Sequence, residues 1–374
     1  MARNASDRVL DGQPWSDFCR ALEEAGQTVL RNGSPLDPFD RAEGFRYLSR
    51  LTRTALETFL EFADPEFPVL FRPAHETVKI GADNPDNFYQ KAAISGGSRY
   101  RISGQRGSVH YLGFGTYAGD YGSGGRRGQT GYLEASDMAV DDQGHFEIIV
   151  SCEDPGGANW LPMEPDTSSL IVRQTFEDRK VEKVADLEII CLDASTRPQA
   201  LTPEALDQGL ARAAAFVGGT ARLFSEWSEG FAKKPNELPA FDPAIAGAAH
   251  GDPHIRYYHG YFEIDPGEAL VVDLQPPPCD YWNFQLNNHW MESLDWRYQR
   301  VDLNHRTAHA EADGSVRIVV AHEDPGHPNW LDPAGHIRGT MCLRWIRAAH
   351  HPNPTLRLVP LNELAAAGLG RSKS

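Results

Sequence analysis

The sequence lacks the features that mark disulfide-rich, zinc-binding and membrane-spanning proteins. Its five cysteines are scattered and form no CxxC pair, which argues against a disulfide framework and a structural zinc site. No run of about 18 apolar residues is present, and the N-terminal MARNASDRVLDGQPW contains no apolar signal segment. We therefore expect a cytoplasmic protein without a membrane partner.

Positive charge is also scarce. The formal net charge is −16 at pH 7, and a diffuse acidic field repels phosphate backbones, so nucleic acid is not an expected partner. The sequence contains no G-x-S-x-G, GxxxxGKS/T or HxH motif. These absences favour a protein without a cofactor or bound metal. Two histidine groups keep a metal site as the lesser alternative: His250, His254 and His259, and His305 with His309.

The chain divides into helical and β-rich segments. Apolar periodicity predicts helices over 16–31 and 41–63, the second capped by Asp40, and a long helix over 203–229 capped by Thr202. Short alternating segments broken by Gly, Pro, Asn and Asp predict strands from about residue 66 and again over 255–348. We expect a helical segment at 1–80, β-sandwich units at 81–195 and 251–350, a connecting helix and linker at 196–250, and a tail at 351–374.

One phrase occurs twice, as EDPGGANWL at 153–161 and EDPGHPNWL at 323–331. The shift of 170 residues holds without a gap back to Tyr111 and Tyr281, and a slip of one residue then aligns Arg173 with Arg344. Such a register predicts an internal duplication, here two tandem jelly-roll-like β-sandwiches in a mainly β protein.

The phrase itself reads best as a structural corner. Asp-Pro-Gly is typical of a turn, and Trp-Leu can then enter a core. The alternative makes Glu153 or Glu323 a catalytic acid. Because chemistry in one site does not require the glutamate in both copies, duplication favours the structural interpretation.

The copies differ most in the strand YWNFQLNNHW, residues 281–290. Strand alternation places Asn283, Gln285, Asn287 and His289 on one face, where the first copy has Gly113, Gly115, Tyr117 and Gly119. Buried amides need hydrogen-bond partners, which a ligand can supply. A ligand pocket in the second unit and a solvated face are equally favoured.

Other candidates surround this face. His289 with His322 and Asp324 is the candidate acid–base group, and Tyr257, His305 and Arg306 are candidate ligand-binding residues. Arg46 and Arg50 share a helix face and could clamp an anion, although pairing with acids such as Glu43 and Glu57 is the favoured alternative. The glycine-rich segment 118–131 is a candidate lid.

The segments DLQPPPCDYWNFQLNN (273–288), ADGSVRIVV (312–320) and NWLDPAGHIRGTMCLRW (329–345) resemble the domain of unknown function family 1214. The resemblance covers roughly residues 255–348 and is fainter in the first copy. It implies a jelly-roll type β-sandwich, with relatives that pair two such units, and it implies no chemistry. Asp332 departs from the proline that usually follows Asn-Trp-Leu in this family, and Met341-Cys342 replace more ordinary strand residues.

Three functions remain open. The first is a metal-independent acid–base hydrolase or lyase that acts on a polyhydroxylated or aromatic metabolite in the second unit. The second is a non-catalytic module that binds a glycan or a lipid headgroup. The third is a capsid-like assembly protein, for which a homo-oligomer is expected; in the first two cases the partner is a small-molecule ligand.

The enzyme hypothesis makes a direct prediction. His289→Ala and Gln285→Ala should abolish turnover while leaving the melting temperature nearly unchanged, as a thermal melt beside an activity assay would show. A large loss of stability would instead make these residues structural.

Overall fold

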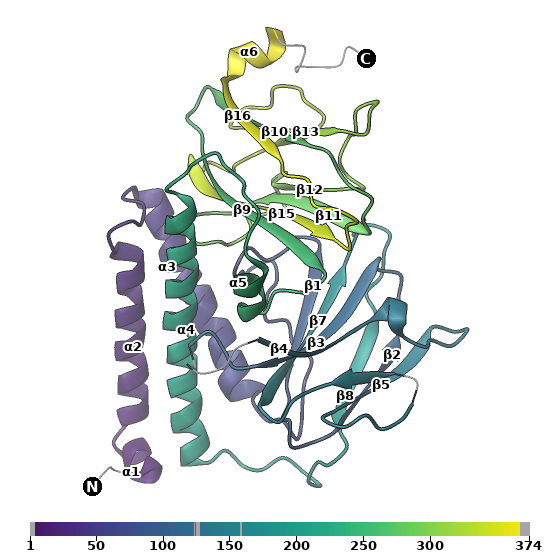
Figure 1. Cartoon of the computed structure of the whole chain (residues 1–374). Helices are drawn as coiled ribbons and strands as arrows, with labels where there is room; N and C mark the ends of the chain where they lie inside the picture. The colour runs from purple at the N-terminus through teal and green to yellow at the C-terminus, as the bar shows by residue number, and fades with distance from the viewer. Residues whose placement is uncertain (1–3, 123, 125–127, 158, 367–374) are drawn as a thin grey trace.

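A computed structural model describes residues 4–122, 124, 128–157 and 159–366. Figure 1 shows helices along one side of the molecule and two β units stacked beside them. The architecture confirms the predicted mainly β fold, with an N-terminal helical segment and a long helix between two β-sandwich units. Within the described ranges, no helix is both long enough and apolar enough to cross a membrane.

The helical layer is built from α1 (Ala5–Leu10), α2 (Gln13–Leu30), α3 (Pro38–Leu56) and α4 (Pro203–Phe231). The Thr202 side chain accepts a hydrogen bond from the Ala205 amide and caps α4 as predicted. The predicted cap of α3 was wrong by one turn. Asp37 caps it by accepting the Asp40 amide, while Asp40 is itself buried and pairs with His336 at 3.1 Å.

The helices continue into shorter elements. A π-helical turn, Glu57–Glu61, extends α3, so the observed end lies near the predicted one. Helix α5 (Pro243–Ala248) precedes the second unit, and α6 (Leu361–Ala366) follows it.

The first unit contains two antiparallel-rich sheets of four strands. One sheet has the order β1-β7-β3-β4 and the other β6-β5-β2-β8. The strands are β1 (Asn87–Ala93), β2 (Tyr100–Gln105), β3 (Tyr111–Ala118), β4 (Gly128–Glu134), β5 (His145–Ser151), β6 (Trp160–Pro162), β7 (Thr167–Thr175) and β8 (Asp186–Cys191).

The second unit repeats this topology strand for strand. Its sheets have the orders β12-β11-β15-β9 and β14-β13-β10-β16, which match the first unit in sequence. The strands are β9 (Ile255–Glu263), β10 (Glu268–Leu274), β11 (Tyr281–Leu286), β12 (Asp302–Asn304), β13 (Val316–Ala321), β14 (Trp330–Leu331), β15 (Arg338–Ile346) and β16 (Thr355–Pro360). Strand β16 lies in the segment expected to be a tail, and it pairs with β10.

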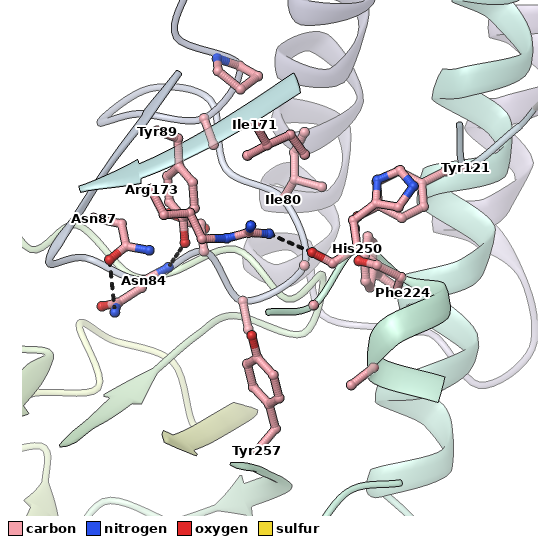
Figure 2. Close-up of a pocket in the computed structure, with 18 of the residues that line it drawn as sticks. Ile80, Asn84, Asn87, Tyr89, Tyr121, Ile171, Arg173, Phe224, His250 and Tyr257 are labelled. Carbon is pink, nitrogen blue, oxygen red and sulfur yellow. Dashed lines mark hydrogen bonds between the residues drawn. The ribbon is translucent and has the colours of Figure 1, made fainter. Parts of the chain in front are cut away.

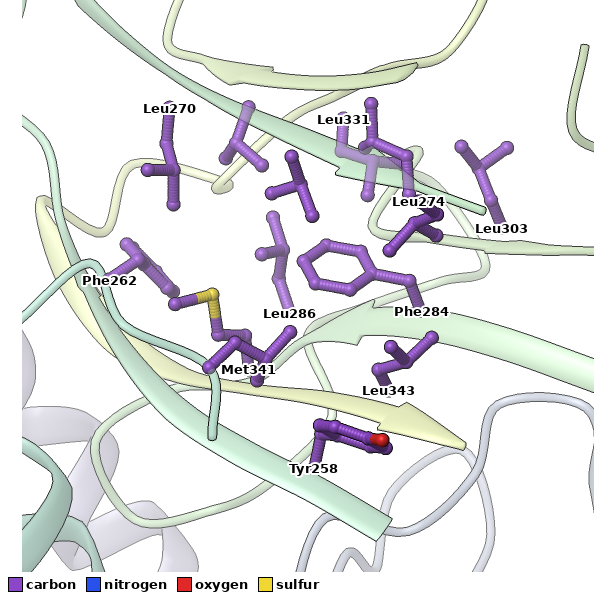
Figure 3. Close-up of a cluster of buried hydrophobic side chains, with 14 of the residues drawn as sticks. Tyr258, Phe262, Leu270, Leu274, Phe284, Leu286, Leu303, Leu331, Met341 and Leu343 are labelled. Atoms are coloured by element: carbon purple, nitrogen blue, oxygen red, sulfur yellow. The ribbon is translucent and has the colours of Figure 1, made fainter. Parts of the chain in front are cut away.

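Each unit encloses its own apolar core between its two sheets. In the second unit, Phe284 and Leu286 of β11 face Leu270 of β10, and all three are fully buried (Figure 3). The opposite, polar face of β11 points away from this core, as the alternation predicted.

The repeated phrase forms the same corner in both units. Asn329 accepts the His309 amide and donates to the His309 and Arg317 carbonyls at 2.7–2.8 Å. Asn159 makes the equivalent three bonds in the first unit. Glu153 and Glu323 are exposed, so the geometry agrees with the structural interpretation of the phrase.

Replacing the corner asparagine tests this role. We expect Asn329→Ala to lower the free energy of unfolding by about 2–4 kcal/mol, because three buried backbone groups lose their partner. Urea denaturation measures the change. The exposed Glu323→Ala in the same phrase should stay within about 0.5 kcal/mol of the unaltered protein; equal effects of the two substitutions would contradict the assignment.

Candidate functional site

The two units are joined by reciprocal contacts from the segments that precede them. Arg173 of β7 donates to the His250 carbonyl at 2.5 Å, and Arg344 of β15 donates to the Ala82 carbonyl. Ala82 and His250 are separated by 168 residues, close to the repeat distance. Each unit therefore receives the segment that leads into the other, as in an isologous interface between two subunits.

A tyrosine accompanies each arginine in the same way. Tyr89 of β1 lies opposite Arg173, and Tyr257 of β9 lies opposite Arg344. The Tyr89 hydroxyl accepts the Asn84 amide at 3.0 Å, and the Tyr257 hydroxyl accepts the Asp252 amide at 3.2 Å. The arginine–tyrosine pairs are therefore equivalent elements of one pseudo-symmetric interface.

The two carbonyls are presented by unusual backbone. Ala82 has φ 57° and His250 has φ 61°, in the left-handed region that residues other than glycine rarely adopt. Such a conformation persists only where surrounding contacts hold it. The arginine bonds at both carbonyls are contacts of this kind.

A cavity of about 170 Å³ lies at this interface. Figure 2 shows Arg173 reaching across it toward His250, with Tyr257 entering from the second unit and Phe224 from α4. The remaining wall is aromatic or apolar and includes Ile80, Tyr121, Ile171, Phe216, Trp227, Phe241 and Ile255.

The charge in this cavity is the two guanidinium groups. Arg173 and Arg344 are 9% and 4% exposed. In the described part of the chain no carboxylate forms an ion pair with either group; their protein partners are hydroxyl, amide and carbonyl oxygens. Burial lowers the pKa of Arg173, but Tyr117 and Asp252 more than offset it, so its pKa stays above the ordinary value.

Two neutral histidines also line the cavity. Burial lowers the pKa of His250 to about 4 and that of His259 to about 3. His250 Nε2 and His259 Nδ1 are buried and have no hydrogen-bond partner among the described residues. Both are uncharged at neutral pH and have an unused polar atom.

The predicted polar face of β11 lies behind the cavity wall. Asn283, Gln285 and Asn287 are fully buried, which excludes the solvated alternative. They line no part of the cavity and bond to protein: Asn283 Nδ2 to the Asn84 side chain, and Gln285 Nε2 to the Asp83 carbonyl, each at 2.9 Å. Gln285 Oε1 accepts Arg344 at 2.5 Å, so this face holds a cavity arginine in place.

His289 is separated from the cavity. Its Nδ1 lies 2.9 Å from the Tyr261 hydroxyl and 3.3 Å from Ser228 Oγ. Burial lowers the pKa of His289 to about 3. His289 is therefore not placed beside His322 or Asp324 in an acid–base group.

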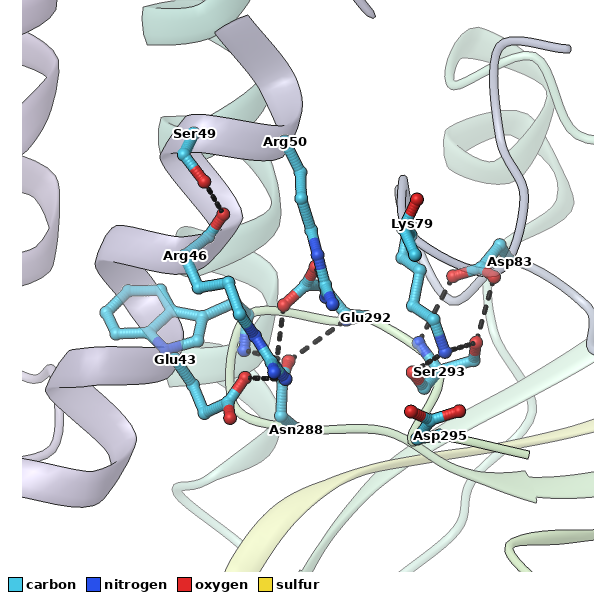
Figure 4. A network of polar contacts seen from close by, with 12 residues as sticks. Glu43, Arg46, Ser49, Arg50, Lys79, Asp83, Asn288, Glu292, Ser293 and Asp295 are labelled. Carbon is cyan, nitrogen blue, oxygen red and sulfur yellow. Dashed lines mark hydrogen bonds and ion pairs between the residues drawn. The ribbon is translucent and has the colours of Figure 1, made fainter. Parts of the chain in front are cut away.

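The predicted arginine clamp is occupied by acids of the protein. Arg50 pairs with the buried Glu292 at 2.6 Å, and Arg46 pairs with Glu43 (Figure 4). The expected pairing with Glu43 is observed for Arg46, whereas the Arg50 partner comes from the turn after β11. Neither arginine lines the cavity.

The other candidates are dispersed. Tyr257 lines the cavity, but His322, Asp324, His305 and Arg306 do not. His322 Nε2 lies 3.0 Å from the Ile264 carbonyl, and His305 Nε2 lies 2.8 Å from Glu177. Asp324 accepts the Gly326 amide in the exposed corner, and Arg306 is exposed.

Two further predictions concern loops and metals. Positions 123 and 125–127 of the candidate lid lie outside the described residues, so the lid stays a prediction. Among the described residues, no group of three or more His, Cys, Asp or Glu side chains is arranged to hold a metal ion.

The sequence contained a signal for the cavity arginines that was set aside. Arg173 and Arg344 align in the repeat, and positions shared by both copies were assigned to the fold. A basic residue on a strand face that must be buried is an equally good indicator of an anion site. The shared positions, rather than the divergent ones, supply the charge of the cavity.

Comparisons with known proteins describe relatives without an assigned activity. A family model described as "Protein of unknown function (DUF1214)" matches residues 269–349. A crystal structure of an uncharacterized protein from Burkholderia cenocepacia is 49% identical, with a TM-score of 0.94, and covers 96% of this chain and 100% of its own. The VPA0106 protein from Vibrio parahaemolyticus is 12% identical, with a TM-score of 0.47, over 85% of this chain and 98% of its own. No curated protein matches.

The contacts of Gln285 replace the earlier expectation for its substitution. We expect Gln285→Ala to lower the free energy of unfolding by about 2–3 kcal/mol, because the buried Arg344 and the Asp83 carbonyl lose a partner. The exposed Gln299→Ala should change it by less than about 0.5 kcal/mol. A urea midpoint for Gln285→Ala equal to that of Gln299→Ala would show that the amide does not hold Arg344.

Proposed function

Since the chain belongs to the DUF1214 family, whose description assigns no activity, we propose a function from the cavity itself: the protein binds a small organic acid between its two β units. The acid's carboxylate lies between the Arg173 and Arg344 guanidinium groups, and its apolar body contacts the aromatic wall.

The two buried arginines carry this proposal. A buried charge without an opposite charge costs several kcal/mol, and a carboxylate compensates it through charge-assisted hydrogen bonds. Arginine also has five donors in a planar arrangement that fits a carboxylate. The nearby Asp252 provides only distant compensation, because its Oδ2 accepts Tyr111 at 2.7 Å.

The size and lining of the cavity restrict the ligand. A cavity of about 150 Å³ lined by apolar residues is known to hold a benzene molecule. The present cavity, at about 170 Å³, suits an acid of about that size. A glycan without charge leaves both guanidinium groups uncompensated, so the binding of a neutral sugar is less well supported.

Turnover of the bound acid is the second candidate function. It is favoured by His250, a neutral imidazole with an unused Nε2 in the cavity wall. A base of this kind can accept a proton from a ligand within hydrogen-bond reach. The acid–base hydrolase or lyase proposed from the sequence would then use His250 in place of His289.

Calorimetric titration with benzoate tests the binding proposal. We expect benzoate to bind at least tenfold more tightly than benzamide, its neutral counterpart, because only the acid compensates the arginines. Arg173→Met and Arg344→Met should each weaken benzoate binding by about 10- to 100-fold, the value of about 1.5–3 kcal/mol for a hydrogen bond to a charged group.

An exposed arginine provides the matched control. Arg20→Met removes a surface charge that pairs with Asp17 and should leave benzoate binding unchanged. Near-UV circular dichroism establishes that each variant keeps its tertiary packing. Equal affinity for benzoate and benzamide in the unaltered protein would contradict the proposal, whatever the variants do.

A further inference from the structure

We infer that the ligand is an aromatic acid with a hydroxyl group on its ring, and that the ring is directed toward the second β unit. This inference rests on the proposed function, since the carboxylate position at the two arginines sets the direction of the ring. It follows from a difference between the two units at otherwise equivalent positions of the cavity.

The position two residues beyond each cavity tyrosine differs between the units. In β1 it is Lys91, and in β9 it is His259. Lys91 Nζ lies 3.5 Å from Asp120, which also pairs with Arg212 at 3.3 Å. The end of the cavity formed by the first unit is therefore charged and already paired within the protein.

The end formed by the second unit is aromatic and neutral. His259 lies parallel to Tyr257 at 6.0 Å and to Phe231 at 5.7 Å, with interplanar angles of 6° and 8°. Phe241 contacts its ring edge-on at 4.9 Å, and Trp227 lies at 6.4 Å. Aromatic groups prefer such offset and edge contacts, so this end favours a further flat ring over a saturated body of the same size.

His259 also accounts for the hydroxyl group. Its side chain is 5% exposed, it lines the cavity, and its Nδ1 has no partner in the described ranges of the chain. A buried polar atom without a partner is costly. A phenolic hydroxyl both donates and accepts a hydrogen bond, so it satisfies Nδ1 in either tautomer of the neutral imidazole.

A ranking of four acids tests the inference on the unaltered, full-length protein. Calorimetric titration with cyclohexanecarboxylate, benzoate, 3-hydroxybenzoate and 4-hydroxybenzoate separates the ring from the hydroxyl. We expect benzoate to bind about 2- to 10-fold more tightly than cyclohexanecarboxylate. One of the hydroxybenzoates should bind a further 2- to 10-fold more tightly, about what a hydrogen bond contributes.

Two substitutions assign the preference to His259. His259→Phe keeps the ring and should remove the advantage of the hydroxybenzoate while leaving benzoate affinity within about 2-fold. Lys91→Met, at the equivalent position of the first unit, should leave the ranking unchanged. A hydroxyl preference that survives His259→Phe would overturn the role of His259.

The outcomes separate this inference from the proposal on which it rests. If all four acids bind equally well and still require Arg173 and Arg344, the aromatic assignment is wrong and the organic acid proposal stands. If none of the four acids binds to the unaltered protein, the organic acid proposal and this inference both fail.

Discussion

Two arginine–carbonyl bonds hold the two β units against each other. Arg173 reaches the segment that leads into the second unit, and Arg344 reaches the segment that leads into the first. Both carbonyls belong to residues with left-handed backbone, and both arginines are buried. The polar face of β11, with Gln285 bonded to Arg344, follows from this constraint because a buried guanidinium needs several acceptors.

The same constraint places charge where the units meet. A duplicated chain brings equivalent residues together at its pseudo-symmetry axis, and here those residues are two cations. Their attraction to a carboxylate is strong because the surrounding wall is apolar. The helix α4 occurs only once, so its aromatic residues, including Phe224 and Trp227, close one side of the cavity and make it unequal at its two ends.

Much of the fold followed from the sequence because its signals are local or periodic. The shift of 170 residues predicted the two β units, and the Thr202-Pro203 start predicted α4. The site was harder to predict because its residues come from segments far apart in the chain. Alternation placed Gln285 on the correct face of β11, but only the tertiary structure shows that Asp83 and Arg344 cover that face.

The central claim is that Arg173 and Arg344 together receive a carboxylate. A crystal structure of the protein with benzoate at saturating concentration tests it most directly. We expect density for one benzoate in the cavity, with its carboxylate oxygens within hydrogen-bond distance of both guanidinium groups. An empty cavity, or benzoate bound there with its carboxylate turned away from the arginines, would contradict the claim.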